Sequence, residues 1–110
     1  MSLRLEDFFL PRVTDIIIDT FLSAKRTLSM GVHTKNNVFE LFGFDFLLDE
    51  DFRTWLIEVN FNPFLGCPNE YMRKLVPNMI NDMLKIVLDP VLKPRTVPDS
   101  DRPNDFELIY

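Results

Sequence analysis

The strongest structural pattern in the sequence lies in residues 39–63, which read FELFGFDFLLDEDFRTWLIEVNFNP. The first part of this stretch is apolar on both alternations, which is typical of a strand that is covered on both faces. The second part has apolar residues at every second position, as a half-buried strand does. The acidic residues at 49–51 indicate a turn between them. The stretch therefore predicts two strands, over about 38–48 and 53–61, joined as an antiparallel hairpin.

Helical periodicity flanks this hairpin on both sides. Apolar residues recur at helical spacing over residues 11–30, with Pro11 suited to a first helical position and Gly31 to the position after the end. A second apolar stripe predicts a helical region over about 69–88. Pro77 should kink or split that region, because proline removes an internal hydrogen bond.

The end of the chain has a different character. Residues 94–110 are rich in proline and charge and are predicted to form an extended or mobile tail. Residues 1–93 are interpreted as part of one α/β domain of the α+β kind, with the order helix, hairpin, loop and helix.

Composition argues against several classes of protein. The net charge of −5 argues against a nucleic-acid-binding protein, since such proteins present a basic face. No apolar run is long enough to span a membrane, and no signal peptide opens the sequence. Cys67 is the only cysteine, which excludes an internal disulfide and fits a reducing compartment. We therefore expect a cytoplasmic protein that binds neither nucleic acid nor membrane.

Three oxygen-bearing side chains interrupt the apolar hairpin: Asp45, Glu58 and Asn60. Glu58 and Asn60 are two residues apart in one strand, so they share a face. A turn of two or four residues would place Asp45 opposite Leu56 and Glu58 opposite Gly43, with all three polar side chains on one face. A turn of odd length would instead put Asp45 on the other face.

The residues alone leave two interpretations of this set. Two carboxylates and an amide oxygen are hard ligands suited to Mg²⁺ shared with substrate phosphates, and Gly43 would leave room beside them. Alternatively the acids are structural, with Glu58 paired to Arg53 or Lys35, because a buried carboxylate needs a cation or a donor. The two interpretations are about equally supported at this point.

The string FELFGFD at 39–45, the acidic turn DED at 49–51 and the string WLIEVNFNP at 55–63 together resemble the signature of tubulin-tyrosine-ligase-like proteins. In that family the pattern is F-E-L-[FY]-G-x-D, an acidic turn, and W-L-[IL]-E-[VI]-N-x-x-P. The resemblance covers about residues 11–90. It implies the C-terminal part of an ATP-grasp domain, whose hairpin belongs to a larger sheet.

The resemblance also implies an enzyme. Asp45, Glu58 and Asn60 would bind the Mg²⁺ ions that bridge the phosphates of ATP, and no catalytic residue beyond these ligands is implied in this chain. The parent would phosphorylate a carboxylate and let an amine attack the acyl-phosphate, joining glutamate, glycine or tyrosine to tubulin or another protein. Its partners would be tubulin, ATP and a free amino acid, at microtubules in the cytoplasm or in cilia. Polyglutamylation is one form of this modification.

In that family, the lysines that hold the phosphates, the adenine clamp and the basic substrate path lie upstream of the matched region. The isolated chain is therefore expected to be an inactive fragment that dimerises or swaps elements through exposed strand edges. A second hypothesis is a non-catalytic relative that serves as a tubulin-binding or scaffold module. A third is an unrelated α/β domain whose hairpin acids are structural.

Overall fold

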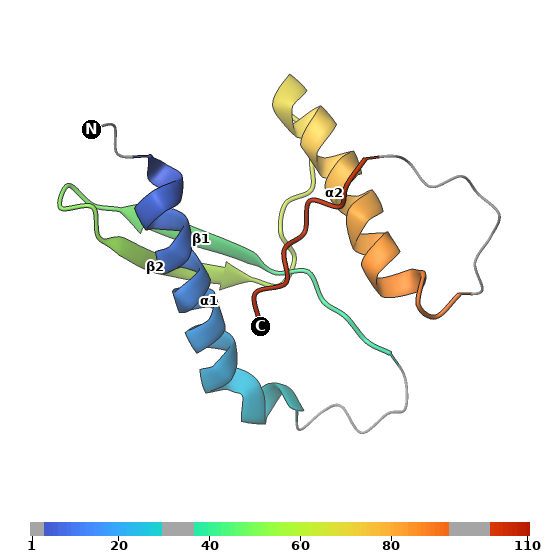
Figure 1. Cartoon of the computed structure of the whole chain (residues 1–110), viewed down its shortest axis with the longest axis horizontal. Coiled ribbons are helices and arrows are strands. Elements are labelled where there is room, and N and C mark those ends of the chain that lie inside the picture. The colour runs from blue at the N-terminus through green and yellow to red at the C-terminus, as the bar shows by residue number, and fades with distance from the viewer. Residues whose placement is uncertain (1–3, 30–36, 93–101) are drawn as a thin grey trace. The chain divides into compact units, whose positions relative to one another are not determined.

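The computed structural model describes residues 4–29, 37–92 and 102–110. In chain order its elements are α1 (Leu5–Ser29), β1 (Gly43–Leu48), β2 (Thr54–Asn60) and α2 (Glu70–Leu88) (Figure 1). This α+β arrangement confirms the predicted fold class. The chain divides into two compact units, one formed by Met1–Pro63 with Ile109–Tyr110 and the other by Phe64–Leu108.

Helix α1 begins at Leu5, earlier than predicted, so Pro11 lies inside the helix rather than at its first position. Glu6 and Asp7 in the first turn favour the earlier start, because acidic side chains stabilise the positive end of the helix dipole. Pro11 removes only the hydrogen bond to the carbonyl of Asp7, four residues before it. The predicted end cap, Gly31, lies outside the described residues.

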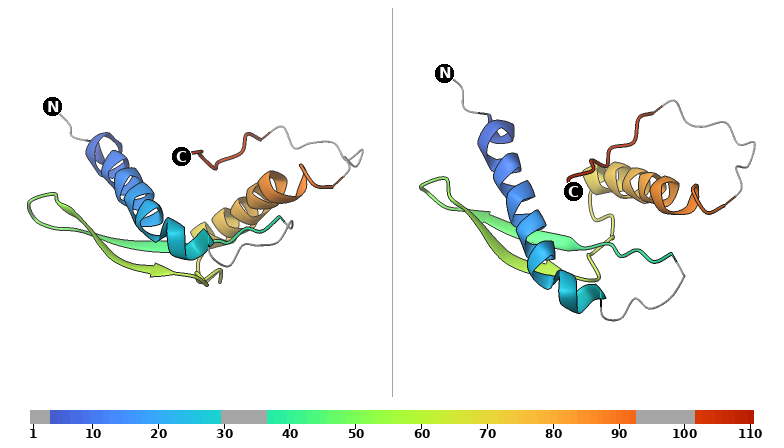
Figure 2. Two further views of the ribbon diagram at one scale, coloured as in Figure 1. Left: turned by 90° about the horizontal axis from the view of Figure 1, so that it is seen from below. Right: turned by 60° about the horizontal axis from the view of Figure 1, so that its bottom comes forward.

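Aromatic rings join α1 to the face of the hairpin across which it lies (Figures 1 and 2). The ring of Phe21 packs against Phe42 and Phe44, with centroids 5.2 and 5.7 Å apart. Nearer the start of the helix, the ring of Phe9 meets that of Phe46 edge-on at 6.5 Å. Tilted and edge-on arrangements are favoured because they match the ring quadrupoles. These contacts make one face of the hairpin the covered face.

Five residues, Asp49 to Arg53, join the two strands, and a hydrogen bond between the first and the last of them leaves a three-residue loop, Glu50 to Phe52. The N–H of Asp49 donates to the carbonyl of Arg53, and the N–H of Phe52 donates to the carbonyl of Asp49, both at 3.0 Å. Phe52 has a φ of 60°, the left-handed conformation that such loops need at their last position. A phenylalanine is unusual there, and its ring makes an edge-on contact with Phe8 at 5.7 Å. The predicted turn of two or four residues is therefore wrong in length.

The register of the hairpin includes a β-bulge. Beside the loop Leu47 pairs with Trp55, and further along Asp45 pairs with Glu58. These two pairs are two residues apart in β1 and three apart in β2, so β2 carries one extra residue at Ile57. The odd-length loop by itself would put Glu58 on the face covered by α1. The bulge returns Glu58 to the exposed face that carries Asp45.

Burial explains why the bulge forms. Leu56 and Val59 are partly buried, while Ile57 and Glu58 between them are exposed. A regular strand would turn Glu58 toward α1 and Val59 toward solvent. Burying an unpaired carboxylate costs several kcal/mol, so the bulged strand, which keeps Glu58 exposed, has the lower free energy.

Helix α2 is one uninterrupted helix, so Pro77 does not split it, and the predicted alternative of a kink stays a prediction. Asn69 caps its start, because the Oδ1 of Asn69 accepts the N–H of Met72 at 2.9 Å. Pro77 is exposed, which leaves the carbonyl of Arg73 free to bond to water in place of the missing N–H.

Few side chains are fully buried. Among the described residues only Val76 and Asp82 are. On the hairpin face turned away from α1, Leu47, Trp55 and Ile57 keep 51%, 53% and 59% of their surface exposed. An exposed apolar face of this kind is consistent with a fragment of a larger domain, and membership of the hairpin in a larger sheet stays a prediction. Neither described helix combines the length and the apolar character needed to cross a lipid bilayer.

Residues 102–110 form neither helix nor strand. Residues 94–101 of the predicted tail lie outside the described residues, and the domain boundary between residues 93 and 94 stays a prediction.

Candidate metal and nucleotide site

Asp45, Glu58 and Asn60 converge at one point of the exposed hairpin face. The Nδ2 group of Asn60 donates to Asp45 Oδ2 at 3.3 Å and to Glu58 Oε1 at 3.2 Å. Asp45 and Glu58 are cross-strand partners, and both are exposed. The structure thus brings together all three residues that the sequence singled out.

The cross-strand partners differ from those predicted. Asp45 lies opposite Glu58 instead of Leu56, and Gly43 lies opposite Asn60 instead of Glu58. The physical reason is the odd-length loop combined with the bulge in β2. Directly opposed residues have Cβ atoms about 4.5–5.5 Å apart, closer than diagonal neighbours. The two carboxylates are therefore nearer to each other than the predicted register would place them.

Gly43 does not leave open room beside the ligands. A Cβ atom at this position would stand 3.0 Å from the Cβ of Pro63 and 3.8 Å from that of Asn60. The chain that follows β2 thus folds back onto residue 43. Glycine is needed here for close approach of the backbone rather than for ligand space.

Asp49 holds the loop end of the hairpin together. Its Oδ1 accepts the N–H groups of Asp51 at 3.0 Å and Arg53 at 2.8 Å, and its Oδ2 accepts the indole N–H of Trp55 at 2.8 Å. The indole bond, followed by the backbone bond from Arg53, lowers the pKa of the Asp49 carboxyl below its usual 3.8. From the sequence alone, residues 49–51 indicated only a turn, and this anchoring role of Asp49 was not predicted.

The structural interpretation paired Glu58 with Arg53 or Lys35, and the structure excludes the pair with Arg53. Arg53 pairs with Asp51 Oδ2 at 3.6 Å, not with Glu58. Within residues 4–29, 37–92 and 102–110, Glu58 makes no ion pair, and its polar contact is the amide of Asn60. The other proposed partner, Lys35, lies outside the described residues.

The donor set fits a hard divalent cation. Two carboxylates and an amide provide the oxygen ligands that Mg²⁺ prefers. The Nδ2 group of Asn60 stands between the carboxylates, and a half-turn of the amide presents its Oδ1 there instead. Among the described residues, no three His, Cys, Asp and Glu side chains lie together as a metal site. The third protein ligand would therefore be the amide.

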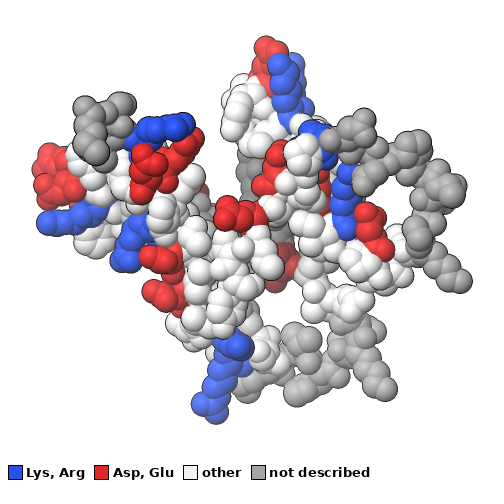
Figure 3. All heavy atoms as spheres, viewed as in Figure 1, with Lys and Arg blue, Asp and Glu red and all other residues white. Residues whose placement is uncertain are grey.

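Charges on the face shown in Figure 3 are intermingled, with Lys and Arg beside Asp and Glu. Most ion pairs between the described residues are exposed, such as the pair of Lys74 with Glu70 at 3.1 Å. Exposed pairs of this kind contribute little to stability. The described residues on this face do not form a broad basic surface of the kind that holds an acidic protein segment.

Sequence reasoning missed one polar cluster. Asp82 of α2 is only 1% exposed and is held by Arg102, Asn104 and Asp105. The one local signal is an aspartate next to the apolar Met83 in a predicted helix. Its partners lie 20 to 23 residues further along the chain, so no local pattern indicates them. The cluster belongs to the second unit, whereas the hairpin site belongs to the first.

Comparison with known proteins identifies the family. The sequence matches the model of the tubulin-tyrosine ligase family over residues 5–96. It is 35% identical to tubulin polyglutamylase TTLL5 of Homo sapiens over 108 residues, which cover 86% of this chain and 8% of that protein. It is 35% identical to tubulin glycylase 3A of Drosophila melanogaster over 109 residues, which cover 99% of this chain and 10% of that protein. The chain belongs to the tubulin-tyrosine ligase family.

A third relative, inactive polyglycylase TTLL10 of Homo sapiens, is 36% identical over 78 residues, which cover 71% of this chain and 11% of that protein. This chain thus spans about a tenth of the length of these relatives. No solved structure matches it.

Proposed function

We propose that the chain is part of an ATP-dependent ligase that joins an amino acid to tubulin or another protein through an acyl-phosphate. Within that enzyme Asp45, Glu58 and Asn60 would hold Mg²⁺, which would supply positive charge beside the phosphates of ATP. One observation carries this proposal: the Asn60 amide lies within 3.3 Å of both carboxylates on one exposed face. The family provides the class of reaction, and the hairpin provides the ligands.

The chain's own contribution is to hold three oxygen ligands in place before the nucleotide arrives. Bound Mg²⁺ would neutralise charge on the phosphates. The ligands sit on paired strands, and the ring of Phe44, next to Asp45 in β1, is backed by Phe21 of α1. Ligands placed on rigid elements lose little freedom on binding, which favours a precise geometry.

Tubulin is the proposed protein substrate, with ATP and a free amino acid as co-substrates. Two of the relatives are named as a tubulin polyglutamylase and a tubulin glycylase, which supports glutamate or glycine as the amino acid added. An enzyme with this substrate would work at microtubules, in the cytoplasm or in cilia. The isolated chain, which spans about a tenth of its relatives, is expected to lack ligase activity.

A non-catalytic tubulin-binding or scaffold module is the second candidate. It is favoured by the similarity to an inactive polyglycylase. The adjoining Asp45, Glu58 and Asn60 argue against it, because a scaffold has no need for three hard ligands on one exposed face.

Metal binding by this chain tests the ligand assignment. Mn²⁺, a paramagnetic substitute for Mg²⁺, should bind saturably in the presence of ATP, as followed by electron paramagnetic resonance. Asp45→Asn and Glu58→Gln should each weaken binding at least about tenfold, because each removes a charged ligand. The matched control is Asp51→Asn, which removes an exposed carboxylate of the same hairpin that pairs with Arg53. Equal binding by all these proteins would refute the assignment.

Mass spectrometry of tubulin tests the reaction. Tubulin is incubated with the full-length parent, Mg-ATP and a mixture of amino acids. We expect a ladder of added masses that identifies the amino acid and disappears in a Glu58→Gln parent. Absence of added mass across several tubulin preparations would favour the non-catalytic module.

We also propose that the isolated chain associates through the exposed hairpin face. Leu47, Trp55 and Ile57 are more than half exposed there, and the described sheet has only two strands, with both edges open. Sedimentation velocity at rising concentration should show a dimer. A monomer at high concentration would contradict this proposal.

A further inference from the structure

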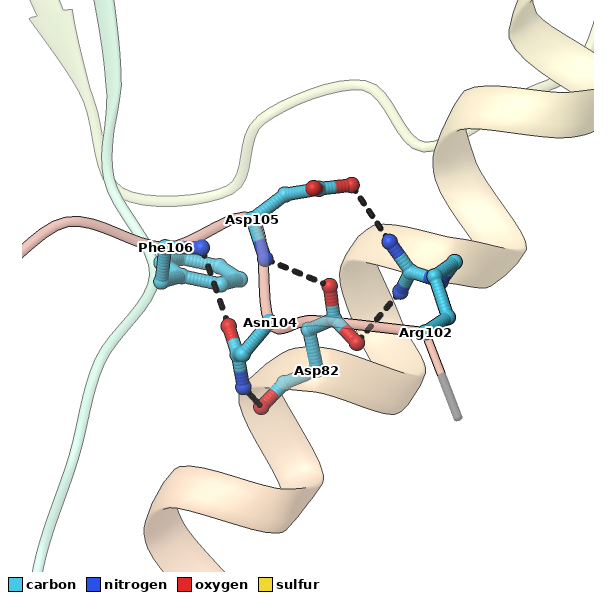
Figure 4. Close-up of polar contacts among 5 residues, drawn as sticks. All are labelled: Asp82, Arg102, Asn104, Asp105 and Phe106. Atoms are coloured by element: carbon cyan, nitrogen blue, oxygen red, sulfur yellow. Dashed lines mark hydrogen bonds and ion pairs between the residues drawn. The ribbon is translucent and has the colours of Figure 1, made fainter. Parts of the chain in front are cut away.

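The second unit contains a buried carboxylate that the proposed reaction does not use. Asp82 of α2 accepts the backbone N–H of Asp105 at 3.0 Å and forms an ion pair with Arg102 (Figure 4). The side chain of Asn104 donates to the backbone carbonyl of Asp82 at 3.1 Å. Three neighbouring residues of the C-terminal segment thus meet one residue of the helix.

The polar groups of this cluster satisfy one another. Arg102 also pairs with Asp105, and the Oδ1 of Asn104 accepts the N–H of Phe106 at 2.9 Å (Figure 4). Among the described residues, no buried side-chain nitrogen or oxygen lacks a partner. Hydrogen bonds to an ionised group are about twice as strong as neutral ones, and a buried charge that loses them is costly. The buried carboxylate and the segment therefore depend on each other.

The same segment seats an aromatic ring beside α2. Phe106 and Asp105 form one wall of a groove of about 470 Å³. The other wall is the side of α2 that carries Tyr71, Lys74, Leu75, Asn78 and Met79. Phe106 keeps 41% of its surface exposed, so its apolar contact with the groove is partial.

We propose that residues 102–106 form a strap that Asp82 fastens to α2, and that this polar anchor, rather than the apolar contact of Phe106, holds the strap closed. The fastened strap completes the groove, and its release would bare the side of α2 that carries Tyr71, Leu75 and Met79.

The ionisation of Asp82 supports a strap that is fastened at neutral pH. The backbone N–H of Asp105, ahead of the guanidinium of Arg102, lowers the pKa of the Asp82 carboxyl below its usual 3.8. The anchor therefore keeps its charge throughout the neutral range.

Amide hydrogen exchange of the whole chain, followed by NMR, tests the proposal. In the wild type the Asp105 N–H should be protected, because it donates to a buried carboxylate. Asp82→Ala should lower that protection at least about tenfold, since the acceptor is gone. Phe106→Ala is the matched comparison, and it should leave the protection of Asp105 within about threefold of the wild type.

Two further variants keep the test valid if Asp82→Ala does not fold. Arg102→Gln and Asn104→Ala change the strap and leave α2 intact, and each should speed exchange of the Asp105 N–H by about threefold or more. Unchanged exchange in these variants would overturn the proposal. A loss of protection in Phe106→Ala as large as that in Asp82→Ala or Arg102→Gln would show that the apolar contact holds the segment.

Discussion

Replacing Phe21 by alanine should remove most of the stability of the hairpin unit. Phe21 makes ring contacts with Phe42 at 5.2 Å and Phe44 at 5.7 Å. Two aromatic pairs are worth about 1–3 kcal/mol beyond burial, and a partly buried phenylalanine adds about 1 kcal/mol of transfer free energy. The expected loss is therefore about 2–4 kcal/mol. A core of this size rarely supplies more than about 3–5 kcal/mol.

Urea denaturation followed by tryptophan fluorescence measures this effect. Trp55 is the only tryptophan and lies in β2, so its signal reports on the hairpin unit alone. With a slope of about 1 kcal/mol per molar urea, the loss corresponds to a shift of about 2–4 M in the midpoint. Phe21→Leu keeps apolar volume but removes the ring pairs, and it should cost about half as much.

The matched control is Leu22→Ala, one residue further along α1. Leu22 is 41% exposed and has no aromatic ring, so its replacement should change the free energy of unfolding by less than about 1 kcal/mol. If Phe21→Ala left the midpoint within about 0.5 M of the wild type, the aromatic cluster would not be what supports β1. The same would follow if Leu22→Ala were equally destabilising. Because Phe44 adjoins Asp45, we also expect Phe21→Ala to weaken Mn²⁺ binding.

Three other changes give separate tests of the structure. The pKa of Asp49 is lowered in the fold, so its ionised form contributes stability that is complete above 3.8 and is lost as the pH falls through the lower folded value. In thermal unfolding followed by Trp55 fluorescence, Asp49→Asn should have a lower melting temperature than the wild type near neutral pH. Below about pH 4, the melting temperature of Asp49→Asn should fall less steeply than that of the wild type. Gly43→Ala would bring a Cβ to 3.0 Å from Pro63 and should destabilise the hairpin by about 1–2 kcal/mol in urea titrations. An unchanged midpoint would mean that the loop after β2 shifts freely. Pro77→Ala should stabilise α2 by about 1–3 kcal/mol, because it restores an internal hydrogen bond at an exposed position. The midpoint of thermal unfolding, followed by circular dichroism, should rise in Pro77→Ala, and an unchanged midpoint would contradict this prediction.

The existence of the main elements was predictable because each has a local cause. The apolar stripe and Asn69 define the start of α2, and the acidic triplet marks the hairpin loop. The limits of α1 were less predictable, since its first turns are held by the rings of Phe8 and Phe9 against distant hairpin residues. Contacts of this kind leave no periodic signal in the helix itself.

The members of the candidate site could be proposed from the sequence, whereas their geometry could not. Alternation within one strand places Glu58 and Asn60 on the same face whatever the partner strand does. The position of Asp45 relative to them depends on loop length and on the bulge at Ile57. Two departures from the predicted register, an odd loop and an extra residue, compensate for each other and leave the three side chains together.

Periodicity and turn chemistry close in the chain were thus enough to predict the α+β class, the hairpin and the three polar residues of its exposed face. The register and the attachment of residues 102–106 to Asp82 depend instead on contacts between residues far apart in the chain. The register is set by which side chains α1 buries, and the strap by charged partners 20 to 23 residues from Asp82. For the register and for the strap alike, the alternative arrangement has similar local structure and differs in the burial of a carboxylate.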